Sequence, residues 1–308
     1  MSLHDKPLIA VVGATGAQGG SVVDALIDTM QFNIRGLTRN PQSEHSLKLA
    51  RRGVEMVKCN LNNRDELAQA FQGAYGLFAT TNFWQQEIME NPAVEIQQGK
   101  NIADAAKQAG IQHLVLSSLP DANKISGGKY HDLHHFNNKA QIEYYVKSLE
   151  IPTTVVNFGY YMSNWSNNPD QFRKRSDGDY EVDLLVSPDT QVPPIDAVVD
   201  GGHCVVHCFR NPQETMGQSY DLACGYSTLG QMIDTLAKVG GKKIHINVLT
   251  PEEAAKHSIY GIPEIYKMYQ YIVEFGYFGG RGLERSLDIF GVFNSFEDFL
   301  YHHNWKLA

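Results

Sequence analysis

The fold is decided by one short segment near the N-terminus, Leu8-Ile9-Ala10-Val11-Val12-Gly13-Ala14-Thr15-Gly16-Ala17-Gln18-Gly19. Five apolar residues predict a buried strand, and a G-x-x-G-x-x-G turn follows at the start of a helical pattern over residues 16–30. Gly13 allows a tight turn at positive φ, Gly16 lets the backbone approach a ligand, and Gly19 lets the helix pack close to the strand. Because a helix N-terminus offers N–H groups to an anion, this context predicts a nucleotide-binding turn.

The next 140 or so residues repeat the same alternation of strand and helix. Apolar and β-branched runs predict five more strands, at residues 32–37, 54–58, 75–79, 113–116 and 153–156. Helical patterns lie between them, at residues 43–52, 64–71, 94–109 and 137–149. This pattern predicts an α/β fold, a doubly wound parallel (Rossmann) sheet with strand order 3-2-1-4-5-6.

The second half is less regular and predicts a smaller, mainly helical C-terminal lobe. Residues 161–180 read as a loop region and 219–223 as a short strand, and helices are expected at 195–209, 228–240, 251–258, 263–275 and 295–302. We therefore expect a nucleotide-binding domain over residues 1–158 and a smaller lobe over residues 159–308. Within that lobe, residues 195–224 are expected to return to the Rossmann sheet.

Composition excludes several classes of protein. The chain has 308 residues, of which 43% are hydrophobic and 19% charged, as in globular proteins. Lys and Arg number 26 against 34 Asp and Glu, a net charge of −8, which argues against direct binding of nucleic acid. No apolar run approaches the length of a membrane span, and the N-terminus lacks a secretory signal pattern, so we expect a cytoplasmic or also nuclear protein. In such compartments the four cysteines are expected to be buried thiols.

The residue after the second strand predicts which nicotinamide cofactor is bound. NAD-binding proteins place an acid there to hold the ribose hydroxyl, but this chain has Arg39, and the first acid downstream is Glu44. An arginine binds a phosphate through two hydrogen bonds, and Lys58, at the end of the third strand, adds a second positive charge. The sequence therefore predicts that the phosphorylated cofactor, NADP or NADPH, is preferred over NAD.

The catalytic residues are less clear. Short-chain dehydrogenases carry a Ser and a Tyr-x-x-x-Lys motif; here Ser117 and Ser118 end the fifth strand and Lys139 opens the next helix, but His135 stands four residues before Lys139. His135 is either a proton donor or a cleft residue without a chemical role. The catalytic candidates are therefore His135, Lys139 and Ser118.

Two sets of residues have metal-ligand spacing, and neither is expected to bind a metal. One is His131, His134 and His135, which lacks further ligands nearby, and the other is the helical run His203-Cys204-Val205-Val206-His207-Cys208. Aromatic residues follow several strands, namely Phe83, Trp84, Phe158, Tyr160, Tyr161 and Trp165. These residues indicate either a pocket for a flat ligand or core packing.

The chain resembles the NmrA-like family, atypical relatives of the short-chain dehydrogenases. The resemblance covers most of the chain and rests on Gly13–Gly20, Leu37–Arg39, Gln98–Gly110, His135–Lys139, Gly159–Asn164, Val192–Asp196 and Glu274–Gly280. The family binds NADP and mostly lacks the catalytic tyrosine.

The resemblance also implies a role for each matching residue. The pyrophosphate would lie on Gly13, Thr15, Gly16, Ala17, Gln18 and Gly19, the 2′-phosphate on Arg39, and the adenine on Asn60 and Leu61. The ribose and nicotinamide side would contact Thr80, Thr81, Asn82 and Phe83, the nicotinamide ribose Lys139, and the nicotinamide Gly159, Tyr160 and Tyr161. Relatives often carry Asp in place of Asn60, and Asn accepts the same hydrogen bond.

Two functions follow from the resemblance. The first is an NADP(H)-binding redox sensor or transcriptional co-regulator that acts through protein partners; a homodimer is compatible with the sequence. The alternative is an NADPH-dependent oxidoreductase of quinones or similar small electrophiles, for which hydride transfer needs orientation more than a protein acid. The absent tyrosine favours the sensor over a reductase of alcohols or ketones.

Overall fold

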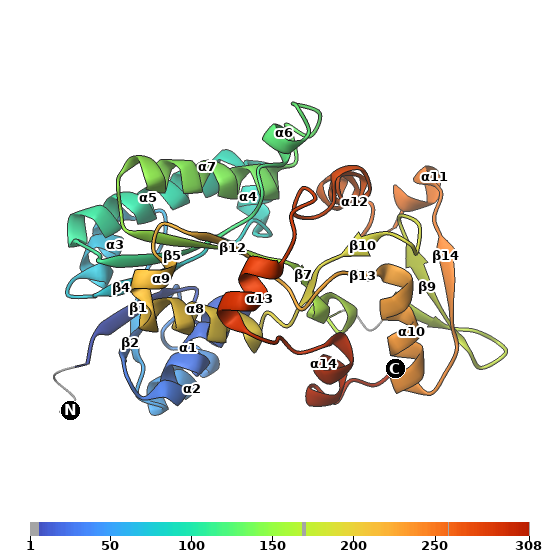
Figure 1. The fold of residues 1–308 in the computed structure, drawn as a ribbon, viewed down its shortest axis with the longest axis horizontal. Coiled ribbons are helices and arrows are strands. Elements are labelled where there is room, and N and C mark those ends of the chain that lie inside the picture. The colour runs from blue at the N-terminus through green and yellow to red at the C-terminus, as the bar shows by residue number, and fades with distance from the viewer. Residues whose placement is uncertain (1–5, 168–170, 258, 308) are drawn as a thin grey trace. The chain divides into compact units, whose positions relative to one another are not determined.

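The chain divides into two units, which the computed structural model describes over residues 6–167, 171–257 and 259–307 (Figure 1). Unit 1 contains the residues up to Asp121, His135–Asn157 and Ala197–Tyr220. Unit 2 contains Ala122–His134, Phe158–Asp196 and the residues from Asp221 onward.

A seven-stranded sheet forms the centre of the Rossmann-like fold, in the order β12-β6-β5-β4-β1-β2-β3. Its strands are β1 (Leu8–Val12), β2 (Asn33–Thr38), β3 (Glu55–Lys58), β4 (Gly76–Ala79), β5 (His113–Ser118), β6 (Thr153–Phe158) and β12 (Ser219–Leu222). All pairs from β3 to β6 are parallel. The bonds Gly217 N–H to Thr153 O and Val155 N–H to Gln218 O show that β12 also runs parallel to β6. The predicted order and the Rossmann class are confirmed.

Helices cover both faces of this sheet. They are α1 (Ala17–Thr29), α2 (Glu44–Arg51), α3 (Arg64–Phe71), α4 (Gln86–Glu90), α5 (Ala93–Ala109), α7 (His134–Ser148), α8 (Asp200–Arg210) and α9 (Pro212–Thr215). Figure 1 shows α3, α5 and α7 on one face of the sheet, and α1, α2 and α8 on the other. The side chains of Ser43 and Asn63 cap α2 and α3, which fixes where these two helices begin.

The core of unit 1 lies between the strands and these helices. β4, β5 and β6 are buried along their whole length, as expected for parallel strands covered on both faces. On the other face, α8 approaches α1 closely: a Cβ at Gly202 would lie 2.1 Å from the carbonyl oxygen of Ser21, and the Gly202 N–H donates to Ser21 Oγ at 2.8 Å. The predicted helix 195–209 begins later, at Asp200, because Pro194–Ile195 forms a short strand.

Unit 2 combines helices with small sheets. Its elements are α6 (Ala122–Ile125), β7 (Tyr160–Tyr161), the 3₁₀ helix η2 (Met162–Trp165), β8 (Phe172–Lys174), β9 (Tyr180–Leu184), β10 (Gln191–Val192), β11 (Pro194–Ile195), β13 (Ser227–Thr228), α10 (Leu229–Gly240), β14 (Ile244–Val248), α11 (Pro251–Ala254), α12 (Pro263–Phe275), α13 (Glu284–Phe290) and α14 (Phe296–His302). Threonine and serine capping boxes at Thr228, Thr250 and Ser295 start α10, α11 and α14.

Two sequence expectations for this unit were wrong. The loop expected over 161–180 contains η2 and β8, and residues 168–170 lie outside the described part of the chain. The helix expected over 251–258 ends at Ala254, with Ser258 also outside the described residues. The sheet β14-β9-β8 was missed because its strands are short and because β14, which runs parallel to β9, is far from it in the chain. β8 pairs with β9 locally, as an antiparallel neighbour. Among the helices described here, none is both long and apolar enough to cross a membrane.

Candidate functional site

The glycine-rich turn has the geometry that its sequence predicts. Gly13 has φ +68°, and the Gly16 N–H donates to the Gly13 carbonyl at 2.8 Å, which closes the turn. A Cβ at Gly19 would lie 2.2 Å from the Gly13 carbonyl oxygen and 2.8 Å from that of Val12. Only glycine therefore fits at position 19 without moving backbone, and α1 starts directly against the end of β1.

The N-terminus of α1 is open to an anion. Gly16 caps the helix without a side-chain hydrogen bond, and the first turn contains no acidic residue. Since the helix dipole places partial positive charge here, an uncapped N-terminus beside a glycine turn favours a phosphate. Thr15 and Gln18 are half-buried and Ala17 is exposed, all on this turn.

Arg39 lies where the second strand ends. It is exposed, and its Nη1 donates to Gln85 Oε1 at 2.7 Å, while Gln85 Nε2 donates to the carbonyl of Asn82 at 3.2 Å. Lys58 pairs in register with Thr38, the residue before Arg39, so both cations lie at the same edge of the sheet. Arg39 and Lys58 therefore lie at the carboxyl ends of neighbouring strands, and their contact with a 2′-phosphate stays a prediction.

Asn60 and Leu61 follow β3 at the same edge. The Asn60 side-chain oxygen accepts the Asn62 N–H at 3.0 Å, and the Asn60 N–H donates to Glu66 Oε2 at 2.8 Å. The Leu61 carbonyl accepts Asn101 Nδ2 at 2.9 Å. These bonds fix the backbone of the segment; the contact with adenine stays a prediction.

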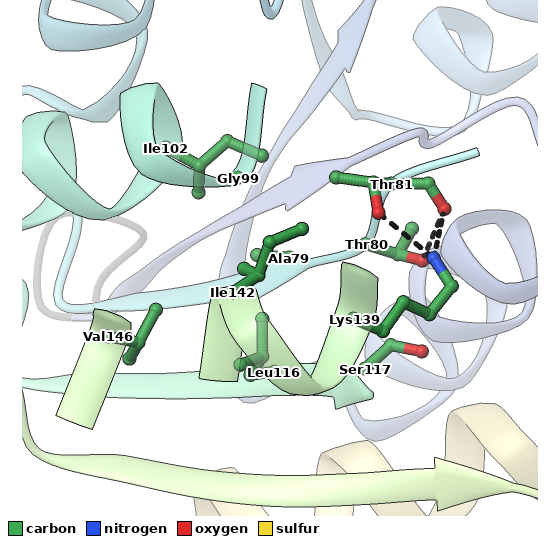
Figure 2. A pocket seen from close by; sticks show the side chains of 10 residues that line it. All are labelled: Ala79, Thr80, Thr81, Gly99, Ile102, Leu116, Ser117, Lys139, Ile142 and Val146. Carbon is green, nitrogen blue, oxygen red and sulfur yellow. Dashed lines mark hydrogen bonds between the residues drawn. The ribbon is translucent and has the colours of Figure 1, made fainter. Parts of the chain in front are cut away.

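Lys139 is the centre of a polar corner at the end of β4 (Figure 2). Its Nζ donates to the Thr81 carbonyl at 2.8 Å, to Thr81 Oγ1 at 2.9 Å and to Glu95 Oε1 at 3.0 Å. A small pocket opens beside it, and Figure 2 shows Lys139, Thr81 and Ser117 at one end and apolar side chains at the other. The lining consists of Ala79, Thr80, Thr81, Gly99, Ile102, Leu116, Ser117, Lys139, Ile142 and Val146.

Glu95 belongs to this corner and was not identified from the sequence. Its side chain has no exposed surface, and it lies on α5 between the half-buried Val94 and Ile96. The signal available was a single acid in the first turn of the predicted helix, which is common at helix N-termini. Nothing local connects it to Lys139, which lies 44 residues away.

His135 is buried among aromatic rings. Its ring centroid lies 5.7 Å from that of Phe83, 5.2 Å from Trp84 and 4.8 Å from Phe136. Trp84 is 45% exposed, so this cluster reaches the surface. Ser118 is also buried, and its hydroxyl donates to the Leu119 carbonyl at 3.4 Å. The roles of His135, Ser118 and Lys139 in catalysis stay predictions.

The Gly159–Tyr161 segment belongs to unit 2. A Cβ at Gly159 would lie 2.2 Å from the Pro193 carbonyl oxygen, so this glycine is needed for packing. The Tyr160 hydroxyl lies 3.0 Å from that of Tyr269, and burial raises the pKa of both phenols. Tyr160 is therefore a buried neutral hydroxyl, and its contact with nicotinamide stays a prediction.

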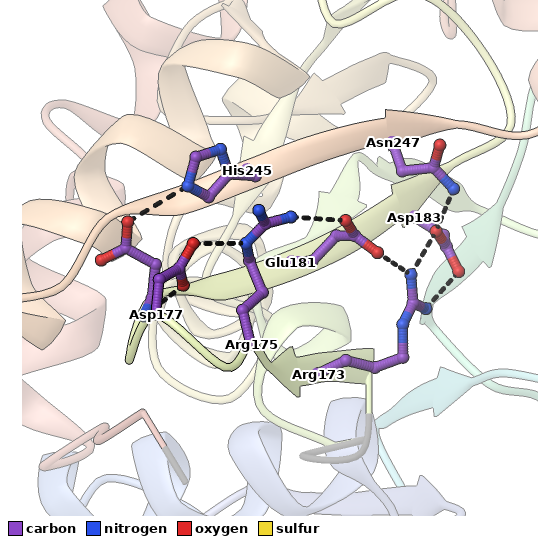
Figure 3. A network of polar contacts seen from close by, with 8 residues as sticks. Arg173, Arg175, Asp177, Glu181, Asp183, His245 and Asn247 are labelled. Carbon is purple, nitrogen blue, oxygen red and sulfur yellow. Dashed lines mark hydrogen bonds and ion pairs between the residues drawn. The ribbon is translucent and has the colours of Figure 1, made fainter.

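Unit 2 also carries a ladder of charged side chains across β8, β9 and β14 (Figure 3). Arg173 binds both oxygens of Asp183, a buried carboxylate that also accepts Asn247 Nδ2 at 2.7 Å. These bonds to Arg173 hold the pKa of Asp183 below its usual range. The ladder stabilises the three-stranded sheet.

At one end of this ladder, Asp177, Asp179 and His245 bring possible metal-ligand atoms within 4.8 Å of one another. However, Arg175 Nε lies 3.2 Å from Asp177 Oδ2, and His245 Nε2 lies 3.1 Å from Asp179 Oδ2. The Arg175 guanidinium beside these side chains would repel a bound metal cation. Contacts among the side chains themselves therefore account for their closeness.

The helical run from His203 to Cys208 separates its two residue types onto different faces. Cys204 and Cys208 are buried, and burial raises the pKa of Cys208 to about 12 and that of Cys204 well above its usual value. His203 is exposed, and His207 Nε2 lies 3.4 Å from Glu214. The thiols are therefore unreactive core residues, as is Cys59, whose pKa burial raises to about 12.

The sequence of this chain matches a protein family and several of its members. The NmrA-like family model matches residues 5–300. The NmrA-like family domain-containing oxidoreductase FrzB of Cladobotryum sp is 32% identical over 84% of this chain and 80% of its own length. The NmrA-like family domain-containing protein DDB_G0286605 of Dictyostelium discoideum is 29% identical over 97% of this chain and 98% of its own.

Solved structures agree with this assignment at the level of the fold. The negative transcriptional regulator NmrA, solved in complex with NADP and in another crystal with NAD, superposes with TM-scores of 0.78 and 0.79. In both cases the identity is 24%, over 96% of this chain and 94% of that one. The match of the family model over nearly the whole length shows that this chain belongs to the NmrA-like family.

Proposed function

We propose that this protein binds NADP(H) in unit 1 and acts as a redox sensor or co-regulator. The observation that carries the binding is the start of α1, where Gly19 lies so close to the Gly13 carbonyl that any side chain would displace backbone. A helix N-terminus without a cap or an acid follows directly. This arrangement supports a bound pyrophosphate.

The remaining parts of the dinucleotide would be held by residues at the carboxyl ends of the strands. Arg39 and Lys58 would bind the 2′-phosphate, which supports a preference for NADP(H) over NAD(H). The segment 80–83 and Lys139 would contact the nicotinamide-side ribose, as the family resemblance implies. When bound, the cofactor supplies or accepts a hydride at its nicotinamide ring.

The Lys139 corner supports sensing over reduction of carbonyls. Lys139 Nζ bonds to Thr81 and to Glu95 in the described structure, and not to a tyrosine hydroxyl. The residue four positions earlier is His135, whose ring packs against Phe83 and Phe136. A nucleotide site with His135 in the place of the usual tyrosine supports sensing over carbonyl reduction.

Sensing of this kind works through differential affinity for two conformations, which protein partners then distinguish. The net charge of −8 supports protein partners over DNA contacts, in the cytoplasm or nucleus. The second candidate is an NADPH-dependent oxidoreductase of quinones or similar electrophiles. It is favoured by the relative FrzB, which is named an oxidoreductase, and by the exposed Trp84 beside His135, on which a flat substrate could stack.

The deciding experiment combines binding with turnover on one sample. Affinities for NADP⁺, NADPH, NAD⁺ and NADH are measured by calorimetry, and NADPH oxidation is followed with a panel of quinones and aldehydes. We expect NADP(H) to bind more tightly than NAD(H), with no saturable turnover. Saturable turnover that falls in Lys139→Ala would replace the sensor with the oxidoreductase. Failure to bind any of the four nucleotides would overturn both.

A further inference from the structure

Glu95 is a fully buried carboxylate, with no exposed surface on its side chain. Burying a charge is costly unless it is paired and hydrogen-bonded, and well-packed apolar residues often do as well for stability. The position of Glu95 therefore calls for a reason beyond packing.

Both oxygens of Glu95 have partners. Oε1 accepts the Thr81 hydroxyl at 2.7 Å and the Lys139 ammonium at 3.0 Å. Oε2 accepts Asn138 Nδ2 at 3.2 Å, and the same amide nitrogen donates to the Pro92 carbonyl at 2.8 Å. The carboxylate is thus held from two sides, by the end of β4 and by α7.

Thr81 completes a closed triangle with these two residues. Its hydroxyl donates to Glu95 and accepts from Lys139 at 2.9 Å, so each of the three groups bonds to the other two. A lysine side chain has several rotatable bonds and loses much entropy when it is held in one conformation. The triangle fixes the direction of this ammonium before any ligand arrives.

The two helices are also held at a fixed separation one turn further along. A Cβ at Gly99 would lie 2.3 Å from Ile142 Cγ1, so α5 and α7 are in close contact there. Gly99 is one turn after Glu95 and Ile142 about one turn after Lys139. The Ile142 side chain therefore packs directly on the α5 backbone, which keeps the two helices close beside Glu95 and Lys139.

We propose that Glu95 is the positioning residue of Lys139 in dinucleotide binding. Its carboxylate holds the ammonium in one position at the site of the nicotinamide-side ribose, and it acts only through Lys139. This inference rests on the proposed function, because it assumes that Lys139 contacts that ribose.

The test is Glu95→Gln, which keeps the shape and removes the charge, measured with two ligands. NADPH contains the nicotinamide ribose, whereas adenosine 2′,5′-bisphosphate contains only the adenosine end. We expect the affinity for NADPH to fall about tenfold and that for the bisphosphate to change less than about twofold. Loss of structure in the site would weaken both ligands, and a similar loss for both overturns the proposal.

A double-mutant cycle shows whether Glu95 acts through Lys139. Once Lys139→Met has removed the ammonium, adding Glu95→Gln should cost no further affinity for NADPH. Additive losses overturn the proposal. The matched control is Asp104→Asn, which removes another α5–α7 carboxylate contact, the 2.7 Å bond from the Tyr145 hydroxyl, and should leave both affinities unchanged.

If Glu95→Gln does not fold, Asn138→Ala replaces it, because it removes the support of Oε2 without touching Lys139. The expected result is a loss of about threefold for NADPH alone. Unchanged NADPH affinity in a folded variant, with normal binding by the wild type, overturns the role of Glu95. Absence of NADPH binding in the wild type overturns the proposed function itself.

Discussion

The glycine turn and the Lys139 corner lie in the same unit and are built in opposite ways. The turn uses backbone: Gly13 and Gly19 contribute no side chain, and the only charge offered to a ligand is the partial charge of a helix N-terminus. The corner uses side chains, with Lys139, Glu95 and Thr81 in mutual hydrogen bonds.

The difference teaches how each region tolerates change. A backbone site depends on the close approach of chain segments, so an added side-chain atom at a glycine disturbs it. A side-chain site depends on specific partners, so removal of one leaves another unpaired. We therefore expect ligand binding to weaken when a side chain is added at a glycine of the turn, and when a side chain is removed from the Lys139 corner.

The largest effect is expected for Gly19→Ala. Its Cβ would lie 2.2 Å from the Gly13 carbonyl, so the turn must move, and NADPH affinity should fall by more than about a hundredfold. Gly20→Ala is the matched control one residue later, because its Cβ would lie at an ordinary 3.6 Å from the Ala14 carbonyl. Calorimetric titration of both variants checks the prediction, and equal affinities would remove the distinction between the two regions.

A smaller effect is expected where a side chain, not backbone, meets a phosphate. Arg39→Ala should weaken NADPH about fiftyfold and NADH less than about twofold, since only the former carries the 2′-phosphate. Arg52→Ala, which removes another surface arginine that pairs with Asp24, should change neither. Parallel titrations with the two nucleotides give the result; equal losses for both would mean that Arg39 does not select the cofactor.

The smallest effect is expected on the free energy of unfolding, at His113. This buried titratable group has a neutral partner, in contrast to the charged pair of Lys139 and Glu95. His113 Nε2 lies 2.8 Å from Thr154 Oγ1, whose hydroxyl donates to the Thr215 carbonyl, and Nδ1 is buried without a hydrogen-bond partner. Burial lowers the pKa of His113 to about 4 from an ordinary 6.5. The unfolded chain therefore binds a proton between these values that the folded protein does not.

The sign follows from this difference in protons. The stabilisation is fully present above pH 6.5 and is lost as the pH falls toward 4, by about 2 kcal/mol between pH 7 and pH 5. Urea unfolding at the two pH values measures it, with His113→Gln as the variant in which this part of the pH dependence is absent. An identical pH dependence in the variant would refute the assignment to His113.

The same contrast explains what the sequence could predict. The turn was recognisable because strand, glycines and helix are contiguous in the sequence, and because each glycine has a role in the local backbone geometry. The strand order followed from the βαβ alternation, which permits few topologies. Glu95 was not recognisable because its burial depends on Lys139 and Thr81, which other elements deliver. The pairing of β14 with β9 was missed for the same reason, because it joins residues such as Tyr180 and Ile244 that lie far apart in the chain.

The strand β12 has a consequence for how the protein is made. Unit 1 is discontinuous: its sheet ends with β12, and α1 is covered by α8, both of which are synthesised after the unit 2 segment Phe158–Asp196. A nascent chain that has emerged as far as β6 carries all the residues of the glycine turn but has an open sheet edge and an uncovered helix. Such edges pair readily with other chains, so slow translation between residues 158 and 220 would expose this protein to aggregation and to chaperones.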